Sequence, residues 1–147
     1  MPEFRHASVV TVAVAGNPNA GKTTLFNLLT GSNQTVGNYP GVTVEKKEGW
    51  AHWKDQALRL TDLPGTYSLI ARSPDEQVVA DAVLTAPDLA RDRAAVAVVL
   101  LDATALARSL YLLAQVARSG QPVVVAVTMH DVARERGHAP DLDRLAH

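Results

Sequence analysis

The fold is decided by Gly16-Asn17-Pro18-Asn19-Ala20-Gly21-Lys22-Thr23, which matches the phosphate-loop pattern of glycine, four residues, glycine, lysine and serine or threonine. The run before it, residues 8–15, is β-branched and apolar on both faces, which is typical of a buried parallel strand. The run after it, residues 24–29, has an apolar spacing that suits a helix ended by Gly31. This order predicts a nucleotide-phosphate site; the alternative is a glycine-rich turn that binds nothing.

Each part of this loop has a task in phosphate binding. The glycines let successive backbone N–H groups converge on phosphate oxygens without a Cβ in the way. We expect Lys22 on the β and γ phosphates and the Thr23 hydroxyl on Mg²⁺, with the positive end of the following helix facing the same oxygens. The nucleotide-binding residues predicted here are Asn17, Asn19, Ala20, Gly21, Lys22, Thr23 and Thr24.

Helices and apolar strands alternate along the rest of the chain. The predicted strands cover residues 44–53, 57–61, 94–101 and 122–127, and the predicted helices cover residues 74–84 and 105–118. The strand at 44–53 lacks a clean apolar face, so we expect an edge strand that forms a hairpin with 57–61. The pattern predicts an α/β fold of the P-loop NTPase, small G-protein-like type. Its sheet is mostly parallel, with helices on both faces and an antiparallel edge strand.

Composition narrows the classes of function. The 147 residues suit one domain, and 14 Lys and Arg against 15 Asp and Glu exclude a polybasic nucleic-acid binder. The absence of cysteine excludes disulfides and thiolate metal sites, and it fits a reducing compartment. The longest apolar run, residues 94–101, is far shorter than the roughly 20 residues of a spanning helix, so we expect a soluble chain.

A second motif, Asp62-Leu63-Pro64-Gly65, follows a predicted strand 40 residues after Lys22 (62 − 22). The Asp62 carboxylate is placed to reach Mg²⁺ through water, and Gly65 to bring a backbone N–H to the γ phosphate. Taken alone the motif is weak, because an ordinary turn at the end of a strand has the same residues. Behind a phosphate loop it predicts the second half of a triphosphate site.

Between the two motifs, residues 32–43 are polar, contain Gly37, Pro40 and Gly41, and lack periodicity, which predicts a long loop. Thr43 is placed to bring a second hydroxyl and its backbone to Mg²⁺ and the γ phosphate. We therefore predict a switch that orders with triphosphate, in which Gly41, Val42 and Thr43 contact the nucleotide. The alternative is a surface loop in which Thr43 has no role.

A base-reading element is predicted after the strand at 122–127. The residues there are Thr128-Met129-His130-Asp131, where a guanine reader has Asn-x-x-Asp. The Asp131 carboxylate suits the ring N–H and amino donors that only guanine presents. Thr128 is shorter than asparagine and lacks an amide, so we expect guanine preference to survive through Asp131 while affinity falls by about 1 to 3 kcal/mol. Thr128, Met129 and Asp131 are the predicted base contacts; the alternative is a strand-to-loop turn.

Together these residues resemble a small GTPase domain, and more narrowly the N-terminal cytosolic G domain of the ferrous iron transport protein B (FeoB) family. The resemblance depends on residues 16–27, on Val36-Gly-Asn-Tyr-Pro-Gly-Val-Thr-Val-Glu45 and on Asp62-Leu-Pro-Gly-Thr-Tyr-Ser-Leu69. It continues through residues 131–137 and covers about residues 8 to 140. The first two stretches are specific, since general GTPases share the first but lack the second.

The resemblance implies a cytosolic GTPase at the cytoplasmic face of the membrane, coupled to a permease for Fe²⁺ and stimulated by K⁺. In that family the residue matching Asn19, with switch backbone around Gly37 and Tyr39, holds K⁺ beside the phosphates, where a cation stabilises the transition state. Thr66 follows Gly65 where Ras-type enzymes have a water-orienting Gln, so intrinsic hydrolysis should be slow. The implied catalytic residues are Asn19, Lys22, Thr43 and Gly65, and the implied Mg²⁺ residues are Thr23, Thr43 and Asp62.

The sequence differs from a complete G domain at its end. Only 16 residues follow Asp131 (147 − 131), too few for the helix, strand and last base-contacting loop of such a domain. We therefore expect one G domain over residues 1–147, incomplete at its C-terminus, with an exposed sheet edge beside residues 123–127 that favours association between copies. Two other functions stay open: a freestanding GTPase of the ribosome-associated or tRNA-modifying kind, and a nucleotide-binding module without turnover.

Overall fold

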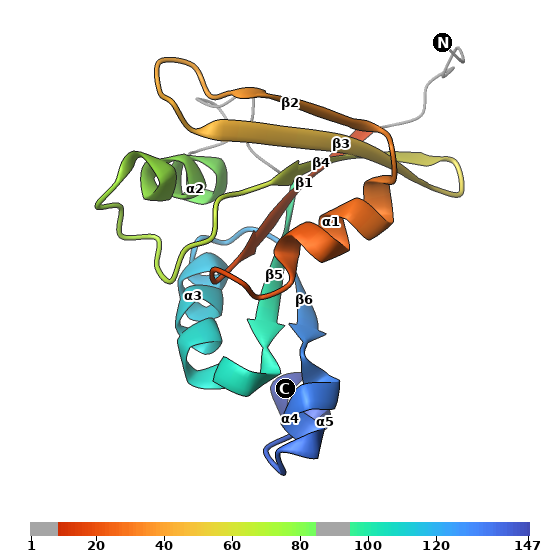
Figure 1. Cartoon of the computed structure of the whole chain (residues 1–147), viewed down its shortest axis with the longest axis vertical. Helices are drawn as coiled ribbons and strands as arrows, with labels where there is room; N and C mark the ends of the chain where they lie inside the picture. Colours follow the sequence, from red (N-terminus) through yellow and green to blue (C-terminus); the bar gives the residue numbers. More distant parts are fainter. Residues whose placement is uncertain (1–8, 85–94) are drawn as a thin grey trace.

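Six strands form one sheet, in the order β2-β3-β4-β1-β5-β6, in the computed structural model, which describes residues 9–84 and 95–147 (Figure 1). In chain order the elements are β1 (Val9–Gly16), α1 (Lys22–Thr30), β2 (Gln34–Asn38), β3 (Glu45–Trp53), β4 (Gln56–Asp62), α2 (Pro74–Leu84), β5 (Val96–Asp102), η1 (Ala103–Ala105), α3 (Leu106–Arg118), β6 (Val123–Thr128), α4 (His130–Glu135) and α5 (Leu142–Leu145). Residues 8 and 94, which the predicted strands included, lie outside the described residues.

The pairing of the strands confirms the predicted class. β1 runs parallel to β4 and β5, and β5 runs parallel to β6. β3 is antiparallel to β4, and β2 is antiparallel to β3. The apolar strands therefore occupy the parallel half of the sheet, whereas the polar strands form its antiparallel edge.

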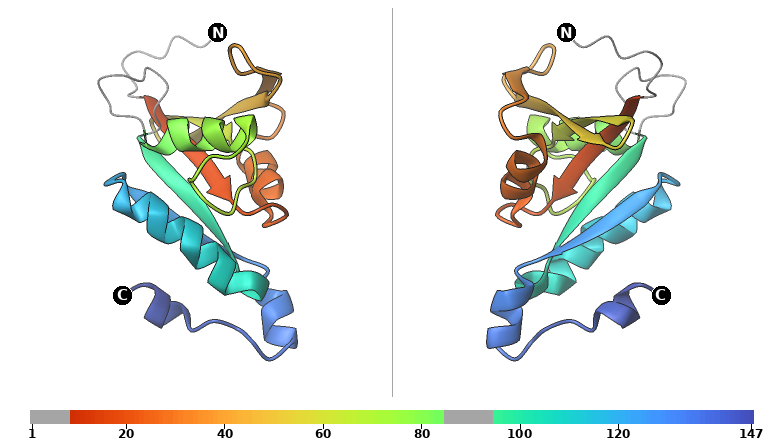
Figure 2. Two further views of the ribbon diagram at one scale, coloured as in Figure 1. Left: turned by 90° about the vertical axis from the view of Figure 1, so that its left-hand side faces the viewer. Right: turned by 90° about the vertical axis from the view of Figure 1, so that its right-hand side faces the viewer.

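Helices cover both faces of the sheet, with α1 on one side of β1 and with α2 and α3 on the other (Figure 2). Successive residues of β1 point to opposite faces of the sheet and pack into two hydrophobic clusters, one on each face. Val14 packs with Phe26 of α1, whereas Ala15 belongs to the cluster that contains Val79 of α2 and Leu112 of α3. Burial on both faces explains why the strand is apolar without alternation.

The predicted loop at residues 32–43 is partly wrong, because residues 34–38 form β2. β2 is the outermost strand of the sheet, so β3, which was expected at the edge, is the second strand. β2 is held by main-chain pairing with β3 and by the Gln34 side chain, whose Nε2 donates to Asn27 Oδ1 at 2.8 Å and to Thr30 Oγ1 at 2.9 Å. An exposed edge strand needs no apolar alternation, so the sequence gives no periodic signal for it.

The opposite edge of the sheet is β6, as predicted for residues 123–127. Val124 and Val125 are 53% and 43% exposed. They face opposite sides of the strand because side chains alternate along it. Among the described residues, no helix combines the length and apolarity that crossing a bilayer requires.

A glycine in β3 permits the close approach of α1 to the sheet. A Cβ at Gly49 would lie 2.5 Å from Thr30 Cγ2 and 3.0 Å from Phe26 Cζ. We expect Gly49→Ala to lower the free energy of unfolding by about 1 to 3 kcal/mol through overpacking, measured by urea denaturation. Gly37→Ala in β2 is the control, because nothing lies within 4 Å of its Cβ position. Equal stability of the two variants would contradict this packing.

Candidate nucleotide-binding site

The loop between β1 and α1 has the backbone that the phosphate-loop pattern predicts. Asn19 and Gly21 both have positive φ, 63° and 92°, and the Ala20 N–H donates to Asn17 O at 3.2 Å. Gly21 immediately precedes α1, so the helix begins at Lys22, two residues earlier than predicted. The loop therefore ends at a helix N-terminus, where unpaired N–H groups favour an anion.

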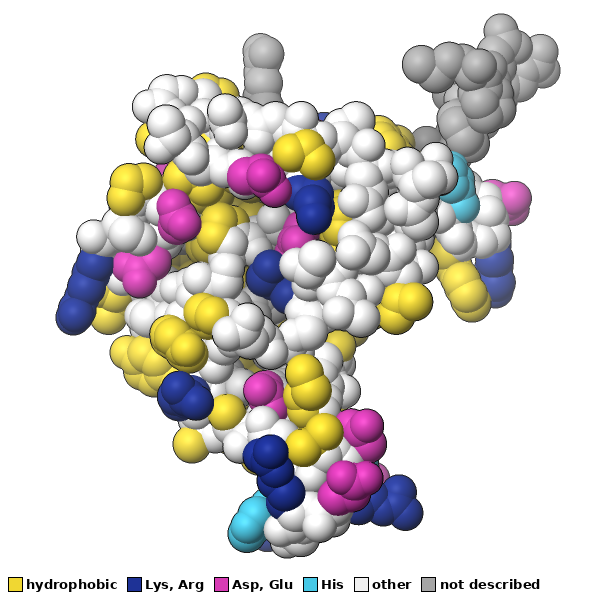
Figure 3. Space-filling model, in the orientation of Figure 1, with side chains coloured by type: hydrophobic (Ala, Val, Ile, Leu, Met, Phe, Trp, Pro, Cys, Tyr) yellow, Lys and Arg dark blue, Asp and Glu magenta, His cyan; other side chains and the backbone are white. Residues whose placement is uncertain are grey.

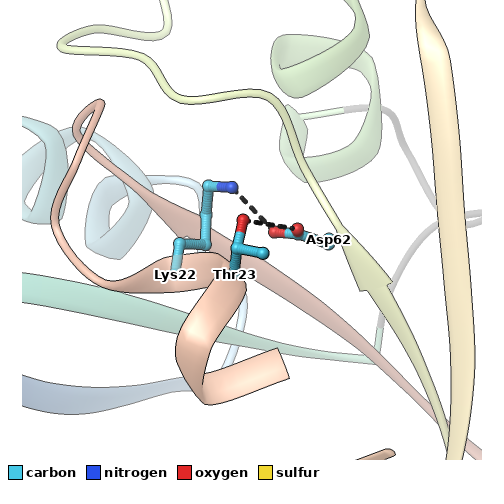
Figure 4. A network of polar contacts seen from close by, with 3 residues as sticks. All are labelled: Lys22, Thr23 and Asp62. Atoms are coloured by element: carbon cyan, nitrogen blue, oxygen red, sulfur yellow. Dashed lines mark hydrogen bonds and ion pairs between the residues drawn. The ribbon is translucent and has the colours of Figure 1, made fainter. Parts of the chain in front are cut away.

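Three predicted side chains meet beside this loop (Figure 4). Lys22 Nζ lies 2.7 Å from Asp62 Oδ1, and Thr23 Oγ1 donates to Asp62 Oδ2 at 3.3 Å. The Lys22 and Asp62 side chains are only 10% and 7% exposed. They meet because Val14, near the end of β1, pairs in register with Asp62 at the end of β4. The structure therefore brings residues of the two motifs together in space.

The oxygens of Thr23 and Asp62 fit a magnesium ion. Mg²⁺ prefers oxygen ligands and is usually held by one or two protein groups together with substrate phosphates. The described part of the chain contains no group of three His, Cys, Asp or Glu residues that could hold a metal ion. A cation at Thr23 and Asp62 would take further ligands from phosphate and water, and from Thr43 if that residue moves to the site.

The segment after β4 packs directly on the phosphate loop. The Thr66 N–H donates to Gly16 O at 3.0 Å, and the Leu63 N–H donates to Val14 O at 3.1 Å. A Cβ at Gly65 would lie 2.9 Å from Pro18 Cα, so no larger residue fits at this contact. Gly65 therefore lies against the phosphate loop, and steric crowding explains the glycine, while its N–H contact with the γ phosphate stays a prediction.

Asn17 has a role that the sequence did not indicate. Its side chain is buried, and in the amide orientation that satisfies both ends, Nδ2 donates to Thr66 O at 3.0 Å and Oδ1 accepts from Ser109 N at 3.3 Å. The side chain thus ties the phosphate loop to α3 and to the segment after β4. A contribution of Asn17 to nucleotide binding is therefore limited to its main chain.

The two remaining predicted side chains of the loop face outward. Asn19 is exposed, and Thr24 is exposed in the first turn of α1. Ala20 is fully buried, so it can face a ligand only through its main chain.

The predicted base-reading residues lie at the end of β6 and the start of α4. Thr128 Oγ1 donates to Ala20 O of the phosphate loop at 2.6 Å, which places the two segments in contact. Met129 has φ 56° and is followed by α4, whose first turn carries the exposed Asp131. In this structure the Thr128 hydroxyl contacts the phosphate loop, and the contact of Thr128 with a base stays a prediction.

The switch residues are not brought to the phosphate loop in this structure. Residues 39–44 lie on one side of α2, and the phosphate loop lies on the other (Figures 1 and 2). Gly41, Val42 and Thr43 line a depression with Pro74 of α2. A cavity of about 480 Å³ lies between this segment, α2 and the sheet. Contacts of Gly41, Val42 and Thr43 with nucleotide, and of Tyr39 with K⁺, stay predictions that require this segment to move. The contact of Gly37 with K⁺ also stays a prediction, and it requires the end of β2 to move as well.

Charged side chains of both signs are interspersed on the face that contains the site (Figure 3). On this face, the described residues form no extended surface of one sign, which agrees with the near-neutral composition.

Comparison with known proteins agrees with this geometry. Residues 10–147 match the family model described as ferrous iron transport protein B. The Fe(2+) transporter FeoB of Legionella pneumophila (strain Lens) is 49% identical over 134 residues, which are 88% of this chain and 17% of that protein. The chain therefore spans about a sixth of the length of this relative.

Solved structures show the same likeness. The G domain of the T. maritima FeoB iron transporter is 42% identical, with a TM-score of 0.83, over 94% of this chain and 80% of that one. The cytosolic domain of that transporter, in a GDP and a GMPPNP form, is 44% identical with TM-scores of 0.80 and 0.79. The matches cover 88% and 87% of this chain, and 49% and 48% of those chains.

Proposed function

Because this chain belongs to the ferrous iron transport protein B (FeoB) family, as its N-terminal G domain, we propose that it binds guanine nucleotides with Mg²⁺ and hydrolyses GTP. The observation that carries this proposal is the meeting of Lys22, Thr23 and Asp62 beside a loop that ends at a helix N-terminus. The relatives solved with GDP and with GMPPNP support guanine nucleotides as the ligand class.

The charged side chains of the site, Lys22 and Asp62, form an ion pair in this structure. The partly buried Lys22 ammonium is paired with the Asp62 carboxylate, so neither charge lies unpaired at low exposure. On nucleotide binding, the ammonium would turn to the β and γ phosphates, and Asp62 with Thr23 would hold Mg²⁺. When bound, Mg²⁺ supplies positive charge that offsets the charge of the phosphate oxygens. Lys22 and the loop amides then stabilise the charge that shifts onto the leaving diphosphate.

The residue after Gly65 supports slow intrinsic hydrolysis. Thr66 is 2% exposed, and its hydroxyl donates to Ser68 O at 2.8 Å. A buried and engaged hydroxyl is poorly placed to orient an attacking water. Gly65 would act through its backbone N–H at the γ phosphate, and Thr43 would join it after residues 39–44 move.

A monovalent cation would complement this site. Asn19 is an exposed residue of the phosphate loop, and its side-chain oxygen is the kind of ligand that K⁺ takes. We place K⁺ between Asn19 and the backbone of Gly37 and Tyr39 in the nucleotide-bound arrangement, where it would add charge that an arginine finger supplies elsewhere.

In the whole transporter, this domain would act as a nucleotide-dependent switch for a membrane permease that carries Fe²⁺. It would lie at the cytoplasmic face of the membrane. The permease is the proposed partner, and the exposed edge of β6 is the proposed site of any association between copies.

Phosphate release distinguishes turnover from binding alone. With GTP and Mg²⁺, we expect turnover to be several-fold faster in KCl than in NaCl at equal ionic strength, and to be lost with EDTA. Asn19→Ala should remove the difference between the two salts, because it removes the proposed K⁺ ligand, while GDP binding stays within about threefold. The control is Asn33→Ala, a change outside the phosphate loop. Binding of GTP without phosphate release would instead support a binding module.

A further inference from the structure

One hydrogen bond joins the predicted base-reading segment to the phosphate loop. Thr128 Oγ1, at the end of β6, donates to Ala20 O at 2.6 Å, across 108 positions of sequence. The Ala20 residue is fully buried, so its carbonyl depends on a protein partner. The Thr128 methyl group also borders the neighbouring glycine, because a Cβ at Gly21 would lie 3.8 Å from Thr128 Cγ2. Thr128 thus contacts the phosphate loop at two successive residues.

The hydroxyl of Thr128 has a single proton to give. A second acceptor, Leu101 O, lies at 3.4 Å, so the proton belongs to the much shorter bond with Ala20 O. An asparagine at this position would carry two amide protons, one for the loop carbonyl and one for an acceptor on a bound base. A threonine can satisfy only one of them, and in this chain it satisfies the loop.

We propose that Thr128 is a positioning residue that fixes the phosphate loop. Its side chain offers no donor to the five-membered ring of a bound guanine, so recognition of the base depends on Asp131. The inference rests on the proposed guanine-nucleotide binding. The ring nitrogen N7 is an acceptor in both guanine and adenine. The lack of a donor to N7 therefore lowers the affinity for both purines. It does not reduce the discrimination between them, which comes from the N1–H and amino donors of guanine.

The loss of nucleotide affinity caused by threonine at position 128 is smaller than the sequence alone predicts. The phosphate loop keeps its hydrogen bond, so the shorter side chain leaves no buried carbonyl unpaired there. Compared with an asparagine at this position, threonine therefore loses only one hydrogen bond to the base. A site of this kind tolerates guanine nucleotides that are altered at position 7.

The test compares GDP with 7-deaza-GDP, which has a C–H group in place of N7, by calorimetric titration in Mg²⁺. For the unaltered chain we expect dissociation constants within twofold of each other. Thr128→Asn should bind GDP more tightly than 7-deaza-GDP by about two- to tenfold, the range of one neutral hydrogen bond. This ratio reports contact with the base and is insensitive to a general loss of stability.

Two further variants test the contact with the phosphate loop. Thr128→Val keeps the shape but has no proton to donate, so both nucleotides should bind about three- to tenfold more weakly with an unchanged ratio. Thr128→Ser keeps the hydroxyl and should restore the affinity. Urea denaturation of each variant confirms that folded chains are compared.

The outcomes separate the inference from the function on which it rests. A preference of more than twofold for GDP over 7-deaza-GDP in the unaltered chain would overturn the inference while the proposed function stands. Binding by Thr128→Val as tight as that of the unaltered chain would also overturn it, because the hydroxyl would then have no positioning role. Failure of the unaltered chain to bind either nucleotide would overturn the proposed function and the inference together.

Discussion

Lys22→Ala is expected to weaken the binding of GDP and GTP by at least 100-fold. The Lys22 side chain is 10% exposed, and its ammonium already donates to one anionic partner, Asp62, at 2.7 Å. Hydrogen bonds from a cation to an anion contribute about 1.5 to 3 kcal/mol each, and two phosphates offer more than one such bond. Since about 1.4 kcal/mol is a tenfold change in affinity, their loss gives the stated factor. Calorimetric titration or a fluorescent nucleotide measures it.

The matched control is Lys46→Ala, which removes a lysine that also pairs with a carboxylate, Glu48, at 3.2 Å. We expect its GDP affinity to stay within twofold. Because Lys22→Ala leaves the Asp62 carboxylate without its cationic partner, urea denaturation must show that the variant is folded at the assay temperature. A folded Lys22→Ala chain that binds GDP as tightly as the control would contradict the phosphate site.

Asp131→Asn should shift the preferred base from guanine to xanthine. A carboxylate accepts from both the N1–H and the amino group of guanine, whereas an amide presents one acceptor and one donor. Guanine then loses a charge-assisted hydrogen bond, and its amino group meets the amide N–H, which is also a donor. Xanthine has a carbonyl in place of that amino group, and this carbonyl accepts from the amide N–H. We expect GDP affinity to fall at least 100-fold and the affinity for xanthosine diphosphate to exceed it.

Asp131 is exposed in the first turn of α4, so this substitution should leave the fold intact. Asp143→Asn is the matched control, because Asp143 is also a carboxylate in the first turn of a short helix, α5. Its ratio of GDP to xanthosine diphosphate affinity should equal that of the unaltered chain. An unchanged ratio in Asp131→Asn would show that the base lies elsewhere.

The parts of the fold that depend on apolar strands were predictable from sequence. A strand buried on both faces has to be apolar, and the β1 sequence shows this without ambiguity. Parallel neighbours place their carboxyl ends at one edge of the sheet, so Lys22, which follows β1, and Asp62, which ends β4, had to meet. The core of the candidate site is therefore encoded in two short motifs.

Other features leave no pattern in a single sequence. β2 is formed by main-chain pairing of polar residues, so periodicity predicted a loop there. Asn17 occupies a variable position of the phosphate-loop pattern, and its inward hydrogen bonds depend on Thr66 and Ser109, which are distant in sequence. The hydrogen bond from Thr128 to Ala20 joins residues 108 positions apart. The ligands of Mg²⁺ and K⁺ stay predictions, because they depend on the place of residues 39–44 when nucleotide is bound.

The central claim is that the loop at residues 16–23, with Asp62 and Asp131, forms a site for a guanine nucleotide. Calorimetric titration of the folded chain with GDP and, separately, with ADP in the presence of Mg²⁺ tests it most directly. The account predicts saturable binding of one GDP per chain and at least 100-fold weaker binding of ADP, since adenine lacks the two donors that Asp131 accepts. Equal affinity for ADP and GDP, or no heat with either nucleotide, would contradict it.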